Sequence, residues 1–326
     1  MLNMAKKEAI QEIDYNYLDR LENIEFTPIF IMGVQRSGTS ILYKILSKTN
    51  NFNFVTAYNA IRNSELIYNH INNLEKKSKN ELNDFLKTKS QTSRGIDNLA
   101  VTSDFPEEYG FVLAQKTSTS KITPKSYKIF ENFCKKIQYI SKNDKLLLLK
   151  NPFDFSNYVY IKSVFPKSKF IFIHRNPLNT LNSQLKAMRT LTKNKSEYMA
   201  LLSPGYDKLH DNKVLLQFYK FLYSSKTPFR INSAIKNLAE STKYYLENID
   251  HLKKEDYVIT KYEDLCEKPS EEINKVLSFL SLKQVSNKDI NSQINPRKTI
   301  FLKEITRNEE VIKQKMKPYF EYCKYL

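Results

Sequence analysis

The feature that most constrains the fold is a short apolar strand that runs directly into a glycine-containing loop and then into an apolar helix. The strand signal covers residues 28–32 (PIFIM) and the loop covers residues 33–40 (GVQRSGTS). The helical signal that follows has apolar residues at helical spacing, at Ile41, Leu42, Ile45 and Leu46. A turn from a buried strand into a helix start presents backbone N–H groups and the positive helix end to an anion. The sequence therefore predicts an anion-binding loop at residues 33–40.

Three more apolar strand signals lie at residues 145–149, 170–174 and 257–260, and each leads into helical sequence. Short apolar strands that alternate with helices are typical of a parallel sheet covered on both faces. We therefore predict an α/β fold with a P-loop NTPase-like parallel sheet flanked by helices. A short amphipathic helix is predicted before the first strand, at about residues 4–20.

No repeat and no Pro/Gly-rich linker divides the chain, so we expect one domain over residues 1–326. Its α/β core is predicted at residues 27–184 and 256–326, with a helical insertion or cap at residues 185–255. The three cysteines form neither a metal-ligand pattern nor a paired motif. Without a signal-peptide core or an apolar run near the roughly 18 residues that a membrane helix needs, the chain is expected to be cytoplasmic, with no transmembrane segment.

The formal net charge is +17, and its distribution is uneven. Residues 116–200 contain 17 Lys and Arg against 4 Asp and Glu, whereas residues 1–115 contain 13 against 14. A local positive field attracts nucleotides, nucleic acid or acidic membranes. Charge alone is equally compatible with a lysine-rich surface that binds nothing, so the position of the basic residues has to decide.

The predicted loop carries the chemistry of an anion site. Gly33 and Gly38 permit tight or left-handed backbone, Arg36 adds a forked cation, and Thr39 and Ser40 add hydroxyl groups. An ATP-binding P-loop reads GxxxxGK[ST]. Here the glycine spacing agrees, but Thr39 stands where that loop has its lysine.

The segment FIMGVQRSGTSIL resembles the 5′-phosphosulfate-binding loop of sulfotransferases that use 3′-phosphoadenosine 5′-phosphosulfate (PAPS), in the RSGT form of tyrosylprotein and many bacterial members. By this resemblance, Arg36, Ser37, Gly38, Thr39 and Ser40 would hold the 5′-phosphosulfate. The resemblance implies PAPS as the sulfuryl donor and 3′,5′-adenosine bisphosphate (PAP) as the product.

The stretch FPKSKFIFIHRNPLNTLNSQL provides an independent test of that resemblance. Arg175 ends a strand, Pro177 suits a helix start, and Ser183 follows Arg175 by two helical turns. The carboxyl ends of parallel strands are where open α/β sheets bind ligands. This pattern is similar to the family's 3′-phosphate motif, which would assign Arg175 and Ser183 to that phosphate.

Other segments extend the likeness over roughly residues 27–326. Lys150 ends the strand in LLLKNPFDF, at the place of a functional lysine in the tyrosylprotein relatives, and Tyr262 begins YEDL, which resembles a late family segment near the nucleotide. With Arg36 and Lys150 as cations, the expected chemistry requires no metal. Arg297 and Lys298 are candidates for contacting the adenine, without a firm register.

The general base is expected to be a carboxylate. None of the four histidines lies in a segment that matches a catalytic histidine of the family, and His174, within a strand, is expected to be packed. DFPEEYGFVL resembles the Pro-x-Glu-x-x-Phe-x-Leu segment in which related enzymes have a catalytic glutamate. This register selects Glu108 as the base and Glu107 as the second choice, although two glutamates after a proline are also common in the first turn of a helix.

Two other functions remain open at this stage. A P-loop kinase would need a loop lysine and a magnesium-binding carboxylate, for which Glu263 and Asp264 are available after a strand. A non-catalytic protein that binds polyanions would account for the basic surplus, although no nucleic-acid-binding motif is present and no nucleic-acid partner is expected. The acceptor, whether glycan, lipid, small molecule or peptide, cannot be identified from the sequence.

Overall fold

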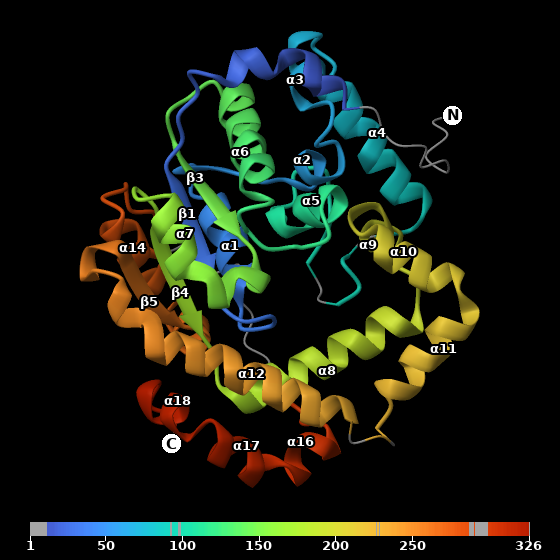
Figure 1. The fold of residues 1–326 in the computed structure, drawn as a ribbon, viewed down its shortest axis with the longest axis vertical. Coiled ribbons are helices and arrows are strands. Elements are labelled where there is room, and N and C mark those ends of the chain that lie inside the picture. Colours follow the sequence, from blue (N-terminus) through green and yellow to red (C-terminus); the bar gives the residue numbers. More distant parts are fainter. Residues whose placement is uncertain are drawn as a thin grey trace.

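The computed structural model describes residues 12–91, 93–96, 99–225, 227, 229–286, 290 and 299–325. Its centre is a five-stranded parallel sheet with the strand order β2-β3-β1-β4-β5 (Figure 1). The strands are β1 (Pro28–Met32), β2 (Phe52–Phe54), β3 (Leu146–Lys150), β4 (Lys169–His174) and β5 (Tyr257–Lys261). The predicted α/β fold and the four predicted strands are confirmed, and the short edge strand β2 is an addition.

Strand order determines which loops meet. β1 lies between β3 and β4, with Ile31 paired to Lys150 on one side and Met32 paired to Phe172 on the other. All neighbours are parallel, so the carboxyl ends of these three strands lie at one edge of the sheet. The chain therefore brings together, at that edge, the loop after β1, the end of β3 and the turn after β4. In open parallel sheets this edge is where ligands bind.

Side chains that alternate along the strands form two apolar layers. Ile29 and Ile31 pack with α1 (Thr39–Ser47) and α14 (Pro269–Phe279) on one face. Phe30 and Met32 lie on the other face, in a larger core with many aromatic rings that α5 (Tyr109–Lys116), α6 (Tyr127–Ser141), α7 (Tyr158–Val164) and α12 (Phe229–Asn248) cover. The sheet is thus buried on both faces, which is why its strands are continuously apolar.

The remaining helices surround this core (Figure 1). They are η1 (Ile13–Leu21), α2 (Ala57–Ile61), α3 (Leu66–Ile71), α4 (Glu75–Thr88), η2 (Pro152–Asn157), α8 (Pro177–Lys193), α9 (Glu197–Leu202), α10 (Pro204–Asp211), α11 (Lys213–Leu222), η3 (Ile249–His251), η4 (Lys254–Asp256), α13 (Tyr262–Glu267), α16 (Lys303–Arg307), α17 (Glu309–Lys315) and α18 (Lys317–Tyr322). The helix predicted near residues 4–20 is a 3₁₀ helix over Ile13–Leu21, and residues 1–11 lie outside the described part. Within the described ranges, no helix has the length and apolarity needed to span a bilayer.

Candidate active site

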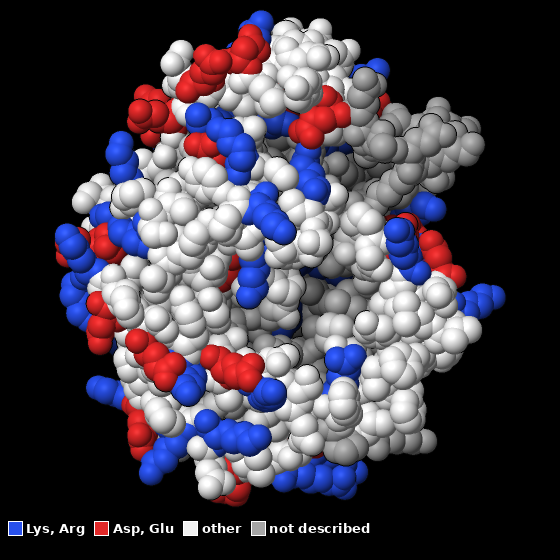
Figure 2. Space-filling view, viewed as in Figure 1, with Lys and Arg blue, Asp and Glu red and all other residues white. Residues whose placement is uncertain are grey.

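A cavity of about 1330 Å³ lies at the carboxyl edge of the sheet. Its lining comes from the loop after β1, the starts of α5 and η2, and the sides of α8 and α12. Figure 2 shows the surface hollowed where these elements meet in Figure 1. Ligand pockets commonly measure about 300–1,000 Å³. The space is therefore large enough for a nucleotide and a second molecule beside it.

The loop after β1 has the tight backbone that its glycines predict. Gly38 precedes α1 with φ of 104°, and Arg36 also has a positive φ, of 71°. A Cβ atom on Gly33 would lie 2.5 Å from Ser37 Oγ and 2.8 Å from the Ile173 carbonyl oxygen. A Cβ atom on Gly38 would lie 2.3 Å from the ring of Tyr262. Neither glycine position therefore has room for a side chain.

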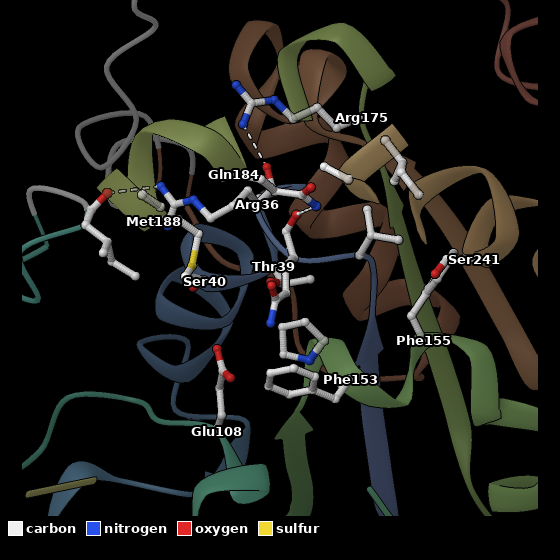
Figure 3. Close-up of a pocket in the computed structure, with 18 of the residues that line it drawn as sticks. Arg36, Thr39, Ser40, Glu108, Phe153, Phe155, Arg175, Gln184, Met188 and Ser241 are labelled. Atoms are coloured by element: carbon white, nitrogen blue, oxygen red, sulfur yellow. Dashed lines mark hydrogen bonds between the residues drawn. The ribbon is translucent and has the colours of Figure 1, made fainter. Parts of the chain in front are cut away.

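The loop and the turn after β4 are joined directly. Arg36 donates from Nε to Ser183 Oγ at 3.1 Å. Arg175 donates to the carbonyl oxygen of Arg36 at 2.9 Å (Figure 3). The guanidinium of Arg175 also lies 4.2 Å from the centre of the Tyr262 ring. The two sequence motifs and Tyr262 therefore form one connected cluster, although they are far apart along the chain.

Two buried polar atoms in this cluster have no hydrogen-bond partner among the described residues. They are Nε of Arg175 and Oγ of Ser37. A buried polar atom without a partner is costly, so such atoms commonly mark places where a ligand or water binds. Arg175 lines the cavity, whereas Ser37 lies beneath the loop, where its N–H donates to the Val34 carbonyl oxygen. Of these two residues, Arg175 is therefore the one placed to donate to a ligand in the cavity.

A second cluster lies at the end of β3. Lys150 is 1% exposed, and its Nζ atom lies 2.7 Å from Glu108 Oε1 and 2.9 Å from Ser40 Oγ. Glu108 precedes the first turn of α5 and lines the cavity, pointing toward the loop that carries Ser40 (Figure 3). A buried cation, a carboxylate and a hydroxyl group are therefore in contact beside the anion-binding loop.

Arg94 belongs to this second cluster, and sequence reasoning missed it. Its side chain is buried, donates to Ser40 Oγ at 3.2 Å, and lies 3.8 Å from Glu108 Oε1 and 3.9 Å from Glu107 Oε1. The segment SRGID that carries it matches no motif and lies in a polar stretch. With Lys150 it places two cations against the two buried glutamates, so the local charge is balanced.

The two candidate bases have different surroundings. Glu107 is fully buried, accepts hydrogen bonds from the Tyr198 hydroxyl and the Glu108 N–H, and does not line the cavity. Burial, with Glu107 as a second cause, raises the pKa of Tyr198 well above its ordinary value, so this tyrosine remains a hydrogen-bond donor. The surroundings of Glu107 are those of a buried structural residue, whereas Glu108 faces the cavity.

His174 is packed, as predicted. Its ring is 1% exposed and forms a 2.8 Å hydrogen bond between Nδ1 and the Tyr319 hydroxyl. Burial, assisted by the charge of Lys261, lowers the pKa of His174 to about 3. The imidazole is therefore neutral, and it lies on the side of β4 that packs against Tyr245.

The far side of the cavity is mainly apolar. Leu185, Met188 and Leu191 lie along one side of α8, and Met199 of α9 and Phe111 of α5 add to this wall. Phe153, which follows β3, is 42% exposed and also lines the cavity, below Thr39 in Figure 3. The cavity thus has a polar half beneath the sheet edge and an apolar half under the helices after β4.

The predicted site residues that the structure describes therefore fall into three groups. The first group lines the cavity and consists of Arg36, Gly38, Thr39, Ser40, Glu108, Arg175 and Tyr262. Lys150 and Ser183 are not in its wall but bond to residues that are, and Ser37 and Glu107 are buried behind them. Arg297 and Lys298 lie outside the described residues. Among the described residues, no three His, Cys, Asp or Glu side chains are grouped so that they could hold a metal ion.

Comparison with known proteins agrees with this architecture. The sequence model of the Sulfotransferase family matches residues 28–217, which are 190 of the 326 residues. The structure is similar to sulfotransferase STF9 from Mycobacterium avium, with a TM-score of 0.65 and 12% identity, covering 96% of this chain and 81% of that one. It is also similar to sulfotransferase STF1 from Mycobacterium tuberculosis H37Rv, with a TM-score of 0.61 and 12% identity, covering 94% of this chain and 80% of that one. No curated protein matches the chain in sequence.

Proposed function

The chain belongs to the sulfotransferase family, and from this premise we propose that it transfers a sulfuryl group from PAPS to a hydroxyl or amine of an acceptor. The observation that carries the proposal is the joining of the two motif turns. Arg36 contacts Ser183, and Arg175 contacts Arg36, so one cation from each turn and the start of α1 face one cavity. A donor with phosphate groups at both ends of its ribose requires two such turns.

In this proposal the 5′-phosphosulfate lies over the loop at Gly38, Thr39 and Ser40, where α1 begins. The 3′-phosphate lies against Arg175. Its oxygen atoms would accept a hydrogen bond from Arg175 Nε, which is buried without a hydrogen-bond partner among the described residues. The Tyr262 ring lies against the Arg175 guanidinium and would hold it in place. Ser183 acts by orienting Arg36, because its hydroxyl oxygen accepts a hydrogen bond from that side chain.

The transfer step uses the second cluster. The acceptor oxygen or nitrogen attacks sulfur while its proton passes to Glu108, and the bond between sulfur and the bridging oxygen breaks to release PAP. Lys150 pairs with Glu108 before the reaction. As Glu108 takes up the proton it loses its negative charge, and the charge of Lys150 becomes available to the leaving oxygen, with Arg36 beside it. Arg94 is a positioning residue, because it contacts Ser40 and both glutamates.

The acceptor would enter from the apolar half of the cavity, next to Glu108. Residues 185–255 contribute Leu185, Met188 and Leu191 to that half, which supports their proposed role as a cap on the acceptor side. The walls there offer more contact to an apolar or amphiphilic acceptor than to a strongly charged one.

Two measurements test the proposal. Purified protein is incubated with radiolabelled PAPS and separate pools of glycans, phenols, lipids and peptides, and label should appear in at least one pool. In parallel, thermal unfolding is followed with PAP and with ATP–Mg²⁺. PAP should raise the unfolding temperature and ATP–Mg²⁺ should not, because a ligand stabilises only the fold that binds it. Stabilisation by ATP–Mg²⁺ alone would favour the kinase alternative instead, and stabilisation by neither would refute donor binding.

A further inference from the structure

Helix α11 (Lys213–Leu222) presents its apolar side to solvent. Val214 is 82% exposed, Leu215 40%, Phe218 55% and Phe221 59%. Residues 214, 218 and 221 are four and three positions apart, so they lie on one side of the helix, with residue 215 beside them. Phe229, at the start of α12, is 64% exposed. Single exposed apolar residues are ordinary, but a run of this size on one element marks an interaction surface.

The other side of α11 attaches it to the protein. Leu216 and Tyr219 are half-buried, and no residue of the helix is fully buried. The C-terminal end of α11 is held by Arg189 of α8, which donates from Nε to the Tyr223 carbonyl oxygen at 2.7 Å. An amphipathic helix normally turns its apolar side inward. Here the strongly apolar side faces outward, so the core formed by the described residues does not account for it.

The surroundings of this apolar side are basic. Residues 186–230 contain nine Lys and Arg against three Asp and Glu, and two of those acids, Asp207 and Asp211, are paired with Lys195. Lys213, the first residue of α11, and Lys208, on the preceding helix α10, are both exposed. Figure 2 shows a largely uncharged surface where α11 lies in Figure 1, with basic side chains at its margins and acidic ones beside them at the end next to α10. Apolar residues bordered by lysines are typical of helices that lie in the interface of an anionic bilayer.

Charge favours an anionic bilayer over a second copy of the chain as the partner of this surface. A symmetric dimer through α11 would bring two copies of the same basic surface together, on chains that each have a net charge of +17. A bilayer with anionic headgroups offers both an apolar layer for the aromatic side chains and a negative surface for the lysines. The observed combination thus complements an anionic membrane.

The position of α11 connects this surface to the cavity. Tyr223, the residue directly after α11, lines the cavity, and so does Arg230, whose guanidinium lies 4.7 Å from the Tyr223 ring centre. The apolar wall of α8 continues from there. A membrane seated on α11 would therefore lie at the rim of the apolar half of the cavity.

We propose that α11, with Phe229, is a docking surface for an anionic lipid bilayer. The aromatic side chains enter the headgroup region, and the surrounding lysines contact anionic headgroups. Docking of this kind is independent of sulfuryl transfer, because none of the exposed side chains of α11 touches the polar cluster at the sheet edge. It explains why a water-facing helix carries Phe at positions 218 and 221.

The test is sedimentation of the full chain with vesicles. Vesicles of equal parts phosphatidylcholine and phosphatidylglycerol should bind the protein, vesicles of phosphatidylcholine alone should bind it much less, and high salt should weaken binding. The double variant Phe218→Ser/Phe221→Ser should lower the partition coefficient at least tenfold, since two large apolar side chains are lost from the contact. The control is Val311→Ser on α17, which changes an apolar residue of 44% exposure on another helix and should bind as the parent does.

Stabilisation by PAP is measured on all three proteins, so that a misfolded variant or a wrong donor assignment is recognised separately from a docking defect. The proposal is overturned if the parent protein does not bind anionic vesicles, or if the double variant binds them equally well. It is also overturned if the parent is a dimer in light scattering and the double variant a monomer, because a second copy would then cover this surface.

Discussion

Replacing Gly38 with alanine should weaken nucleotide binding through a contact that joins the two halves of the site. Gly38 has φ of 104°, which an alanine adopts only at a cost, and the new Cβ atom would lie 2.3 Å from Tyr262 Cδ2. Tyr262 would have to move away. Its ring is also the surface on which the Arg175 guanidinium rests, 4.2 Å from the ring centre. One methyl group in the 5′ loop therefore disturbs the proposed 3′-phosphate residue.

The magnitude follows from these two effects. The unfavourable φ costs about 1–2 kcal/mol. Loss of the contact between Arg175 and the ring adds about 1–2 kcal/mol for a partly desolvated pair. The loop and the ring can move without unfolding the sheet, so most of this cost should appear as weaker binding. A total of about 2–4 kcal/mol corresponds to a dissociation constant for PAP that rises roughly 30- to 700-fold.

Isothermal titration of PAP into the purified variant measures this change. Gly205→Ala is the matched control, because a Cβ atom there has no neighbour within 4 Å, and it should bind PAP within about twofold of the parent. In a Tyr262→Ala background the same Gly38→Ala change should cost about tenfold less, since the ring is already absent. If Gly38→Ala binds PAP as the parent does, or if its effect is unchanged without the ring, the reasoning is wrong.

Three other predictions concern single side chains. Glu108→Gln should lower kcat and kcat/KM together by about 10²–10⁴-fold, while PAP affinity measured by titration is retained; full turnover at saturating acceptor would remove Glu108 as the base. Because the pKa of His174 is about 3 in the folded protein and 6.5 is its ordinary value, the unfolded chain takes up the proton first as pH falls, and stability is lost between those values at about 1.4 kcal/mol per pH unit. His174→Gln should lack this component in urea unfolding at a series of pH values, and equal slopes for the two proteins would contradict the burial argument. Asp154→Ala should lower the free energy of unfolding by about 3–5 kcal/mol, because this buried carboxylate accepts from the Tyr109 hydroxyl at 2.8 Å and from two asparagine side chains. A loss below 1 kcal/mol in the same assay would show that these donors find other partners.

The elements that could be predicted from sequence are those with strong local signals. Pro28–Met32 and Lys169–His174 are short, mainly apolar runs that end in polar turns, and at this length the pattern favours buried strands. In a parallel sheet their carboxyl ends must lie at the same edge. They do, because β1 and β4 are neighbouring parallel strands. The packed state of His174 followed from its place within such a strand.

The parts that could not be predicted depend on long-range contacts. β2 has only three residues, Phe52–Phe54, and its register with β3 exists only after the chain has folded. Arg94 reaches Ser40 across 54 positions from a polar segment with no periodic signal. A sequence motif also does not determine the direction in which each of its side chains points. Ser37 stands within the loop, but its Oγ faces Gly33 beneath it rather than the cavity.

The central claim is that the turns opened by Gly33 and by Arg175 bind the two ends of one bisphosphate. A crystal structure of the protein with PAP tests it most directly. We expect the 5′-phosphate over the start of α1, between Gly38 and Ser40, and the 3′-phosphate within hydrogen-bonding distance of the Arg175 side chain. A complex in which PAP leaves either turn without a phosphate, or binds elsewhere on the chain, would contradict the claim.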